Sequence, residues 1–334
     1  IDLRAGMLDL ADASREISRE DYVGENEAVD RGAVARQHQQ GATIIVQQMQ
    51  NSDAVLGDFC RAIEARFSSH SQTNIYLTPA GAQGFGIHYD NHDVFVLQVE
   101  GEKAWRIYGT PVSNPYRGEG FEPGVHETGP ITHEFVLKAG DCAYIPRGVM
   151  HDASASGDGP SLHVTVGLIV KTWAELMLEA ASQVALEEPA FRRALPPGFA
   201  RRDYDRDTAR KTFAELARIL ADKAKMDDAF DLMTDQFIRS REPDVSGAIF
   251  DASRASAPGD QFLVRATAPW RLADDGEKLV VITAGGDVPF DPADRAALER
   301  ALSGQAFGEA DLACEDPREM ARKLQAFGLV ERAE

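Results

Sequence analysis

Short runs of apolar residues separated by turn-forming residues dominate the chain between about residues 74 and 170. β-Branched, aromatic and leucine residues recur in brief stretches, and Gly, Pro, Asn and Asp stand between them. This spacing is typical of the strands of an antiparallel β-sandwich or barrel. The predicted strands are 74–78, 86–90, 93–99, 103–108, 134–137, 142–145 and 162–169.

Helical periodicity replaces this pattern after residue 171. Trp173, Leu176 and Ala180 fall on one stripe at helical spacing. A break at Pro196-Pro197-Gly198 then separates this helix from the next one. The predicted helices are 51–67, one from 171 onward, 207–225 and 227–241.

The last ninety residues mix short strands with helices. Strands are predicted at 261–265 and 278–282, and helices at 292–303 and 317–327. Helices with a small β-wing suggest a winged-helix domain. The expected class is therefore α+β, with a barrel domain over 1–170, a helical domain over 171–243 and a winged-helix domain over 244–334.

The charge balance is strongly acidic. Lys and Arg number 35 against 54 Asp and Glu, which gives a net charge of −19. From Asp251 to the end there are 16 acidic and 10 basic residues. Such a surface repels phosphates and attracts cationic chains, so basic partners are favoured over DNA, even for the predicted wing.

The chain is expected to be a soluble, cytoplasmic protein. It has no run of about 18 apolar residues, so a spanning helix is excluded. Its three cysteines, at 60, 142 and 314, are far apart and form no CxxC pair, which favours a reducing compartment. Ile1 is not an initiator methionine, so what precedes it stays open.

Candidate metal ligands lie at two places in the strand-rich region. His88 and Asp90 are two residues apart, and positions i and i+2 of a strand share a face. A histidine two residues before an acid also arises by chance in so acidic a chain. His151 strengthens the prediction of a metal site, because it follows a Gly-Asp turn and a Pro-Arg-Gly bend. Two histidines and one carboxylate are the facial triad that holds Fe(II) in cupin-type oxygenases.

Three segments together resemble one known family, the JmjC-type ribosomal oxygenases. The resemblance covers about residues 74–170, and the order of the helical and winged segments that follow also matches. This family consists of Fe(II)- and 2-oxoglutarate-dependent hydroxylases of ribosomal proteins. The segments are His88 to Tyr108, Gly140 to His151, and His163 to Val166.

Carried onto this sequence, the resemblance implies a site for each component of the reaction. It makes His88, Asp90 and His151 the iron ligands, and Lys103 the partner of the distal carboxylate of 2-oxoglutarate. An interior lysine agrees with this, because a buried cation is costly unless it meets an anion. The remaining implied positions are Tyr76 and Thr165 near the cosubstrate, and Asn74 and Gln98 at the substrate mouth.

The expected activity is hydroxylation of a histidine or arginine side chain in a ribosomal or other basic protein, with Fe(II), 2-oxoglutarate and O₂. Two other readings stay open. The first is a JmjC-type demethylase or a tRNA-base hydroxylase, and the second is a metal cupin that acts on a small metabolite without 2-oxoglutarate. A homodimer through about residues 171–241 is also expected, because amphipathic helices without a core of their own must bury Trp173, Leu176, Phe213, Leu216 and Phe237.

Overall fold

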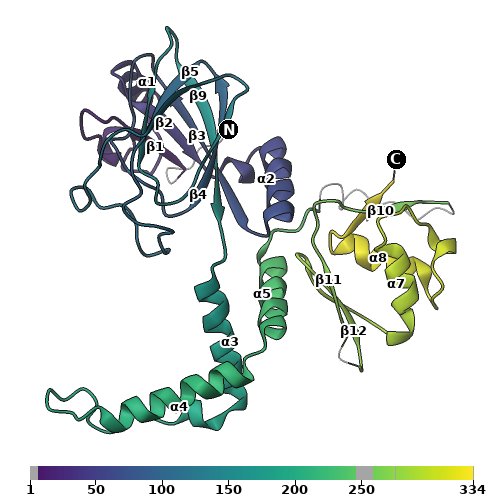
Figure 1. Ribbon diagram of the computed structural model, residues 1–334. Coiled ribbons are helices and arrows are strands. Elements are labelled where there is room, and N and C mark those ends of the chain that lie inside the picture. Colours follow the sequence, from purple (N-terminus) through teal and green to yellow (C-terminus); the bar gives the residue numbers. More distant parts are fainter. Residues whose placement is uncertain (1–6, 246–258, 275, 334) are drawn as a thin grey trace. The chain divides into compact units, whose positions relative to one another are not determined.

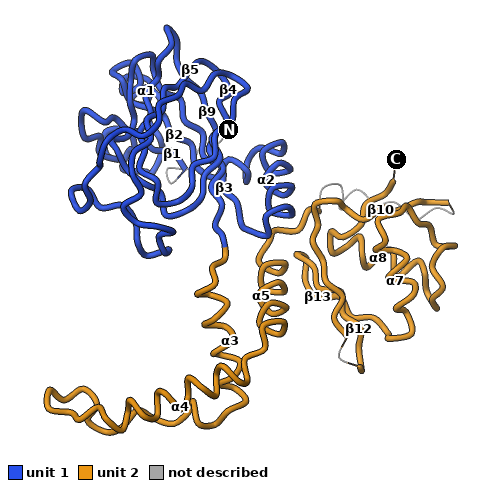
Figure 2. Tube along the Cα trace, viewed as in Figure 1, with its two compact units in different colours: residues 1–170 blue, residues 171–334 orange. Residues whose placement is uncertain are grey.

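The computed structural model describes residues 7–245, 259–274 and 276–333 (Figure 1). The chain divides into two compact units, residues 1–170 and 171–334 (Figure 2). None of the helices within the described ranges combines the length and the apolar character that crossing a bilayer requires.

Two antiparallel sheets form the first unit, and their facing sides enclose one apolar core. Val96 of the larger sheet and Trp105 of the smaller one are both buried in it. The predicted β-barrel, of the cupin type, is confirmed. The larger sheet runs in the order β1 (Leu8–Ala11), β2 (Thr43–Gln47), β3 (His70–Thr78), β9 (Ser161–Ile169), β4 (Asp93–Glu100) and β7 (Cys142–Ile145), and the smaller one in the order β6 (His133–Lys138), β5 (Glu102–Ile107) and β8 (His151–Ala155).

Two helices flank the larger sheet. Helix α1 (Arg31–Gln39) begins where the Asp30 carboxylate accepts two backbone N–H groups, and it buries Val34 against β1. Helix α2 (Ala54–Phe67) begins at Asp53 in the same way and packs against β3. These helices leave the other side of the sheet for the barrel interior.

The predicted strand 86–90 does not form. His88 makes only an isolated bridge with His151, outside any named strand. The His88 side chain bonds to the carbonyl of Gly86 instead, and such local bonds compete with a strand ladder. His88 and Asp90 are therefore brought together by an irregular segment and not by the alternation of a strand.

The second unit begins with three helices, close to their predicted bounds. Helices α3 (Trp173–Glu187) and α5 (Met226–Ser240) pack together through Leu176, Ala180 and Ala229. Between them, α4 (Asp207–Lys223) has no buried residue.

The rest of the second unit has a core of its own, in which Leu298, Phe307 and Leu324 are fully buried. Two small antiparallel sheets and two helices surround it. The division at residue 243 and the winged-helix identity remain predictions, and part of that domain, residues 246–258, lies outside the described residues. The elements are β10 (Phe262–Val264) with β14 (Val330–Arg332), then β11 (Arg271–Asp274), β12 (Leu279–Thr283) and β13 (Gly286–Phe290), and the helices α7 (Arg295–Ala301) and α8 (Pro317–Ala326).

Candidate active site

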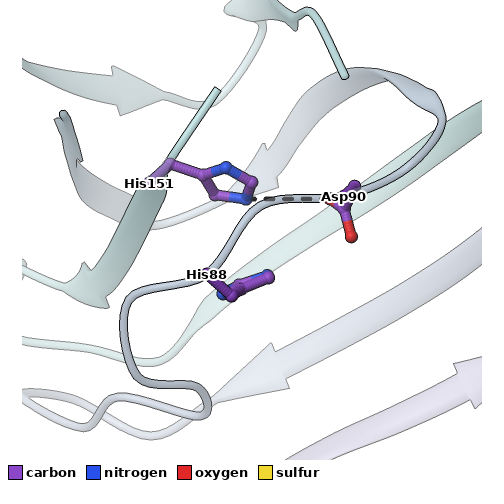
Figure 3. A group of neighbouring side chains, drawn as sticks. All are labelled: His88, Asp90 and His151. Carbon is purple, nitrogen blue, oxygen red and sulfur yellow. Dashed lines mark ion pairs between the residues drawn. The ribbon is translucent and has the colours of Figure 1, made fainter. Parts of the chain in front are cut away.

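The side chains of the three predicted metal ligands lie close together in the first unit. One ligand atom from each of His88, Asp90 and His151 lies within 4.8 Å of the others. The two imidazole rings are 4.6 Å apart between centroids, and Asp90 Oδ2 is 3.8 Å from His151 Nε2 (Figure 3). This spacing lets one cation contact all three side chains.

Backbone contacts hold the two ligand-bearing segments together. His88 and His151 exchange backbone hydrogen bonds of 3.1 and 2.8 Å, and Gly148 N–H donates to the Asp90 carbonyl at 2.9 Å. Gly148 has a φ of +83°, and a Cβ there would collide with the carbonyl of Val112. Only glycine fits this bend without strain, so the bend explains its place three residues before the third ligand.

Both histidines are oriented for metal binding by their own backbone. His88 Nδ1 lies 2.9 Å from the Gly86 carbonyl, and His151 Nδ1 lies 3.0 Å from the Val149 carbonyl. A carbonyl only accepts, so each Nδ1 carries the proton and each Nε2 keeps its lone pair. Metal-binding histidines are commonly fixed in this tautomer by such a bond.

The electrostatics of the cluster suit a divalent cation. Burial lowers the pKa of His151, and the neighbouring His88 lowers it further, which favours the neutral ring that a metal needs. Asp90 supplies one carboxylate oxygen donor and is about one-third exposed. Two imidazoles and one carboxylate match the facial triad of non-haem Fe(II) sites, which leaves coordination positions open.

A cavity of about 250 Å³ lies between the two sheets and includes all three ligands. Of the predicted cosubstrate residues, Lys103, Tyr76 and Thr165 line it, whereas Asn74 and Gln98 are not among the lining residues. The lining is formed by Thr43, Tyr76, Gly84, Phe85, His88, Asp90, Val94, Val96, Lys103, Trp105, Ile145, His151, Ala153, His163 and Thr165.

Lys103 lies buried in this cavity with neutral partners. Its Nζ is 3.2 Å from Thr78 Oγ1 and 3.4 Å from His163 Nδ1, and the residue is 5% exposed. No carboxylate among the described residues pairs with it. Burial lowers the pKa of Lys103 to about 7. An anion that entered the cavity would supply the missing partner.

His163 completes this polar region. Its ring stacks on Tyr76 at 4.7 Å between centroids, and the two residues pair across β3 and β9. Burial and the charge of Lys103 hold the pKa of His163 well below its usual range, so the ring is neutral and its Nδ1 is available to accept from the ammonium. Burial, followed by the charge of Asp90, raises the pKa of Tyr76.

Neither of the two predicted substrate contacts, Gln98 and Asn74, is among the residues that line the cavity. Gln98 is 3% exposed, and its Nε2 donates to Ser161 Oγ and to the Glu100 carbonyl, each at 2.8 Å. The Gln98 side chain is therefore held in the interior and does not lie at the mouth of the cavity. Asn74 is half-buried on β3, where its Oδ1 accepts from the backbone N–H of Gln48 at 3.3 Å.

A long irregular loop, residues 109–132, lies against the ligand-bearing segment. Tyr89 donates to the Gly120 carbonyl at 3.3 Å, Asn91 donates to the Arg117 carbonyl at 2.9 Å, and the Phe121 ring is 6.4 Å from that of His88. The loop also carries three exposed glutamates, Glu119, Glu122 and Glu127, but only one arginine, Arg117. It places acidic charge beside the candidate metal site.

Sequence reasoning did not single out the lining residues Thr43 and Phe85, or Thr78, which contacts Lys103 behind the lining. Thr78 accepts from Lys103 and lies 3.1 Å from the Thr43 hydroxyl. Thr78 was within reach of prediction, because it lies two residues beyond Tyr76 on the same strand face. Thr43 could not be predicted, because nothing in the local sequence distinguishes it and its strand is far from the candidate ligands along the chain.

The chain is similar to known proteins along its first half and beyond. Residues 45–176 match the family model of the JmjC domain. The chain is 36% identical to ribosomal oxygenase 1 of Gallus gallus, over 62% of this chain and 37% of that protein. It is 35% identical to a bifunctional lysine-specific demethylase and histidyl-hydroxylase of Dictyostelium discoideum, over 61% of this chain and 42% of that protein. The chain thus spans about two fifths of the length of these relatives.

The fold also matches solved structures of Escherichia coli YcfD, a ribosomal oxygenase. One of them, in complex with cobalt and 2-oxoglutarate, has a TM-score of 0.52 and 18% sequence identity, and the match covers 99% of this chain and 89% of that one. At this identity the likeness establishes a shared fold. The resemblance to JmjC-type ribosomal oxygenases found in the sequence is confirmed by these comparisons.

Proposed function

Residues 45–176 match the JmjC domain, and on that premise we propose that the chain is a 2-oxoglutarate- and Fe(II)-dependent oxygenase. We propose further that it hydroxylates a histidine or arginine side chain of a ribosomal or other basic protein. In this reaction 2-oxoglutarate and O₂ give succinate and CO₂, and one oxygen atom enters a C–H bond of the target. The observation that carries the proposal is that the His88, Asp90 and His151 cluster and the buried Lys103 line the same cavity.

His88, Asp90 and His151 would hold the iron through two Nε2 atoms and one carboxylate oxygen. Bound Fe(II) would supply the redox chemistry that couples decarboxylation of the cosubstrate to hydroxylation. The protein's own contribution is to fix the donors: the Nδ1–H bonds set the tautomers, and the paired backbone of His88 and His151 sets the spacing. His151 is 5% exposed, so bulk water has little access to that side of the site.

Lys103 would bind the distal carboxylate of 2-oxoglutarate. The ammonium is buried with no described anionic partner, and Thr78 and His163 keep it in place through neutral contacts. Tyr76 and Thr165 line the same cavity and offer hydroxyl groups to the cosubstrate. A cupin that acts on an uncharged small metabolite would leave this buried cation without a partner, which favours an anionic cosubstrate such as 2-oxoglutarate.

A basic polypeptide fits the charge of the site's surroundings. The whole chain carries −19, and loop 109–132 brings exposed glutamates beside the ligand segment. This charge raises the local concentration of cationic chains. Two of the similar proteins are named as ribosomal oxygenases, and ribosomal proteins are basic because they bind RNA.

We further propose that α3 to α5 form a dimerisation region and that residues 244–334 form a winged helix. Trp173 and Phe213 are each 76% exposed, and such large apolar side chains favour a partner surface. Leu176 and Phe237, expected at the same interface, are instead 7% exposed, because they are buried within the chain itself. The proposed interface therefore rests on the exposed face of α3 and on α4.

Mass spectrometry of a ribosomal protein fraction tests the proposal. Incubation with Fe(II), 2-oxoglutarate and O₂ should add 16 Da to one peptide, and fragmentation should place the oxygen on a histidine or arginine side chain. Heat-denatured protein and omission of 2-oxoglutarate are the controls. Loss of 14 Da from a methylated lysine peptide without the gain of 16 Da would favour the demethylase reading.

A further inference from the structure

The loop between β3 and the metal-binding segment, residues 79–87, is held firmly. The Ala82 carbonyl accepts from Ala155 N–H of β8 at 3.0 Å, and the Gln83 carbonyl accepts from Ala13 N–H at 2.9 Å. The Gln83 side chain donates to the Phe85 carbonyl at 2.7 Å. Residue 85 is therefore placed by contacts with two other parts of the unit.

Gly84 adds a second constraint. A Cβ at this position would lie 2.8 Å from Thr43 Oγ1 and 3.0 Å from Thr43 Cβ, closer than ordinary contact. Thr43 is 1% exposed and cannot move aside easily. The loop thus passes directly over the wall of the cavity, and the next side chain along the chain is that of Phe85.

Phe85 lines the cavity and yet is 44% exposed. Its ring centroid is 5.7 Å from that of His88 and 6.3 Å from that of Tyr76. The Phe85 ring is thus an exposed apolar surface on a well-held loop, next to a candidate metal-binding histidine. Such a surface is available to a bound substrate.

We propose that Phe85 is a specificity-determining residue, the platform on which the planar side chain of the target lies while its reactive carbon faces the metal site. This inference rests on the proposed function and goes beyond it by assigning the recognition of target chemistry to one residue. Imidazole and guanidinium groups both stack favourably on a phenyl face, whereas an aliphatic side chain gains only contact area there.

A purely structural role for Phe85 would be to shield His88 from water. A substitution by leucine distinguishes the two roles. Leucine keeps apolar bulk over His88 but has no aromatic face, so Phe85→Leu separates shielding from stacking. Phe85→Tyr and Phe85→Trp keep the face and serve as matched controls.

The test uses three lysine-rich peptides that differ only in a central histidine, arginine or leucine. Their binding is measured by fluorescence anisotropy with the Mn(II)-loaded full chain and 2-oxoglutarate, without O₂. The wild-type protein should bind the histidine or the arginine peptide about three- to tenfold more tightly than the leucine peptide. Phe85→Leu should abolish that preference, and Phe85→Tyr and Phe85→Trp should retain it.

The inference is overturned if the wild-type protein does not discriminate among the three peptides, or if its preference survives in Phe85→Leu. Thermal unfolding of each variant identifies any that fail to fold, and the Tyr and Trp variants then keep the comparison valid. Failure of the proposed function has another signature, which is the absence of succinate when the wild-type protein is given Fe(II), 2-oxoglutarate, O₂ and a ribosomal protein fraction.

Discussion

Replacing Lys103 with methionine should have two effects of opposite sign. In the empty cavity the ammonium is buried beside Thr78 and His163, both neutral, so it destabilises the fold. In the proposed complex the same ammonium meets a carboxylate. Methionine keeps the length and apolar character of the side chain while removing the charge. It should therefore stabilise the empty protein and weaken 2-oxoglutarate binding.

The size of the first effect follows from the pKa of Lys103, which falls from 10.5 to about 7 in the fold. Each unit corresponds to 1.36 kcal/mol, so the protonated side chain costs on the order of 5 kcal/mol at low pH. Between pH 7 and 10.5 the unfolded chain holds the extra proton, so stability rises with pH over this window. The advantage of Lys103→Met should be greatest below pH 7, about 4–5 kcal/mol at pH 6.5, and should shrink to about 1–2 kcal/mol at pH 9.5.

The second effect is the loss of a buried charge pair. Removing one partner of such a pair costs about 3–5 kcal/mol, which corresponds to a loss of affinity between about 100-fold and several thousandfold. Wild-type affinity should also fall as pH rises above about 7, because an unprotonated Lys103 must first take up a proton. Lys103→Arg, whose guanidinium stays charged, should lose that pH dependence.

Calorimetric titration of 2-oxoglutarate into Mn(II)-loaded protein, at several pH values, measures both the affinity and the proton uptake. Thermal unfolding of the metal-free variants measures the stability. The reasoning is refuted if Lys103→Met binds 2-oxoglutarate as tightly as the wild-type protein, or if Lys103→Arg keeps the wild-type pH dependence.

Three further predictions concern the metal site and the assembly. Asp90→Ala removes the only anionic ligand and should lower both metal affinity and turnover, so stoichiometric metal binding with full activity would contradict the ligand assignment. Gly148→Ala should destabilise the protein by about 2–4 kcal/mol and weaken metal binding, because the bend has a positive φ and no room for a Cβ. Gly118→Ala, where a Cβ would meet open space, should change neither stability nor metal binding. Chemical denaturation and metal titration compare the two variants. Phe213→Glu should shift the mass from dimer to monomer in light scattering at micromolar concentration, and a wild-type monomer would defeat the proposed interface.

The strands rich in β-branched and aromatic residues were predictable from sequence. The predicted 142–145 coincides with β7, and 162–169 differs from β9 by one residue. Strand β8 was missed because its sequence, His-Asp-Ala-Ser-Ala, has none of these residues. It forms because β5 offers a partner along its whole length, which is a tertiary cause that no local pattern records.

The site was predictable where side-chain chemistry is distinctive. Spacing and resemblance singled out three candidate ligands and a lysine, and the structure places all four side chains in one cavity. Gln98 lies deeper than predicted, because strand alternation gives the face of a residue but not its depth, and its amide nitrogen donates to Ser161 in the interior. Phe85 was missed because a phenylalanine in a loop resembles any other until the structure shows it at the edge of the cavity.

The most direct test of the central claim is to measure succinate released by the wild-type protein supplied with Fe(II), O₂ and 2-oxoglutarate, with and without a ribosomal protein fraction. We expect succinate to form, to increase when the target is present, and to match the hydroxylated product in amount. Asp90→Ala should release none. Equal succinate release by Asp90→Ala, or none by the iron-loaded wild-type protein with target present, would contradict the assignment of this cavity as a 2-oxoglutarate oxygenase site.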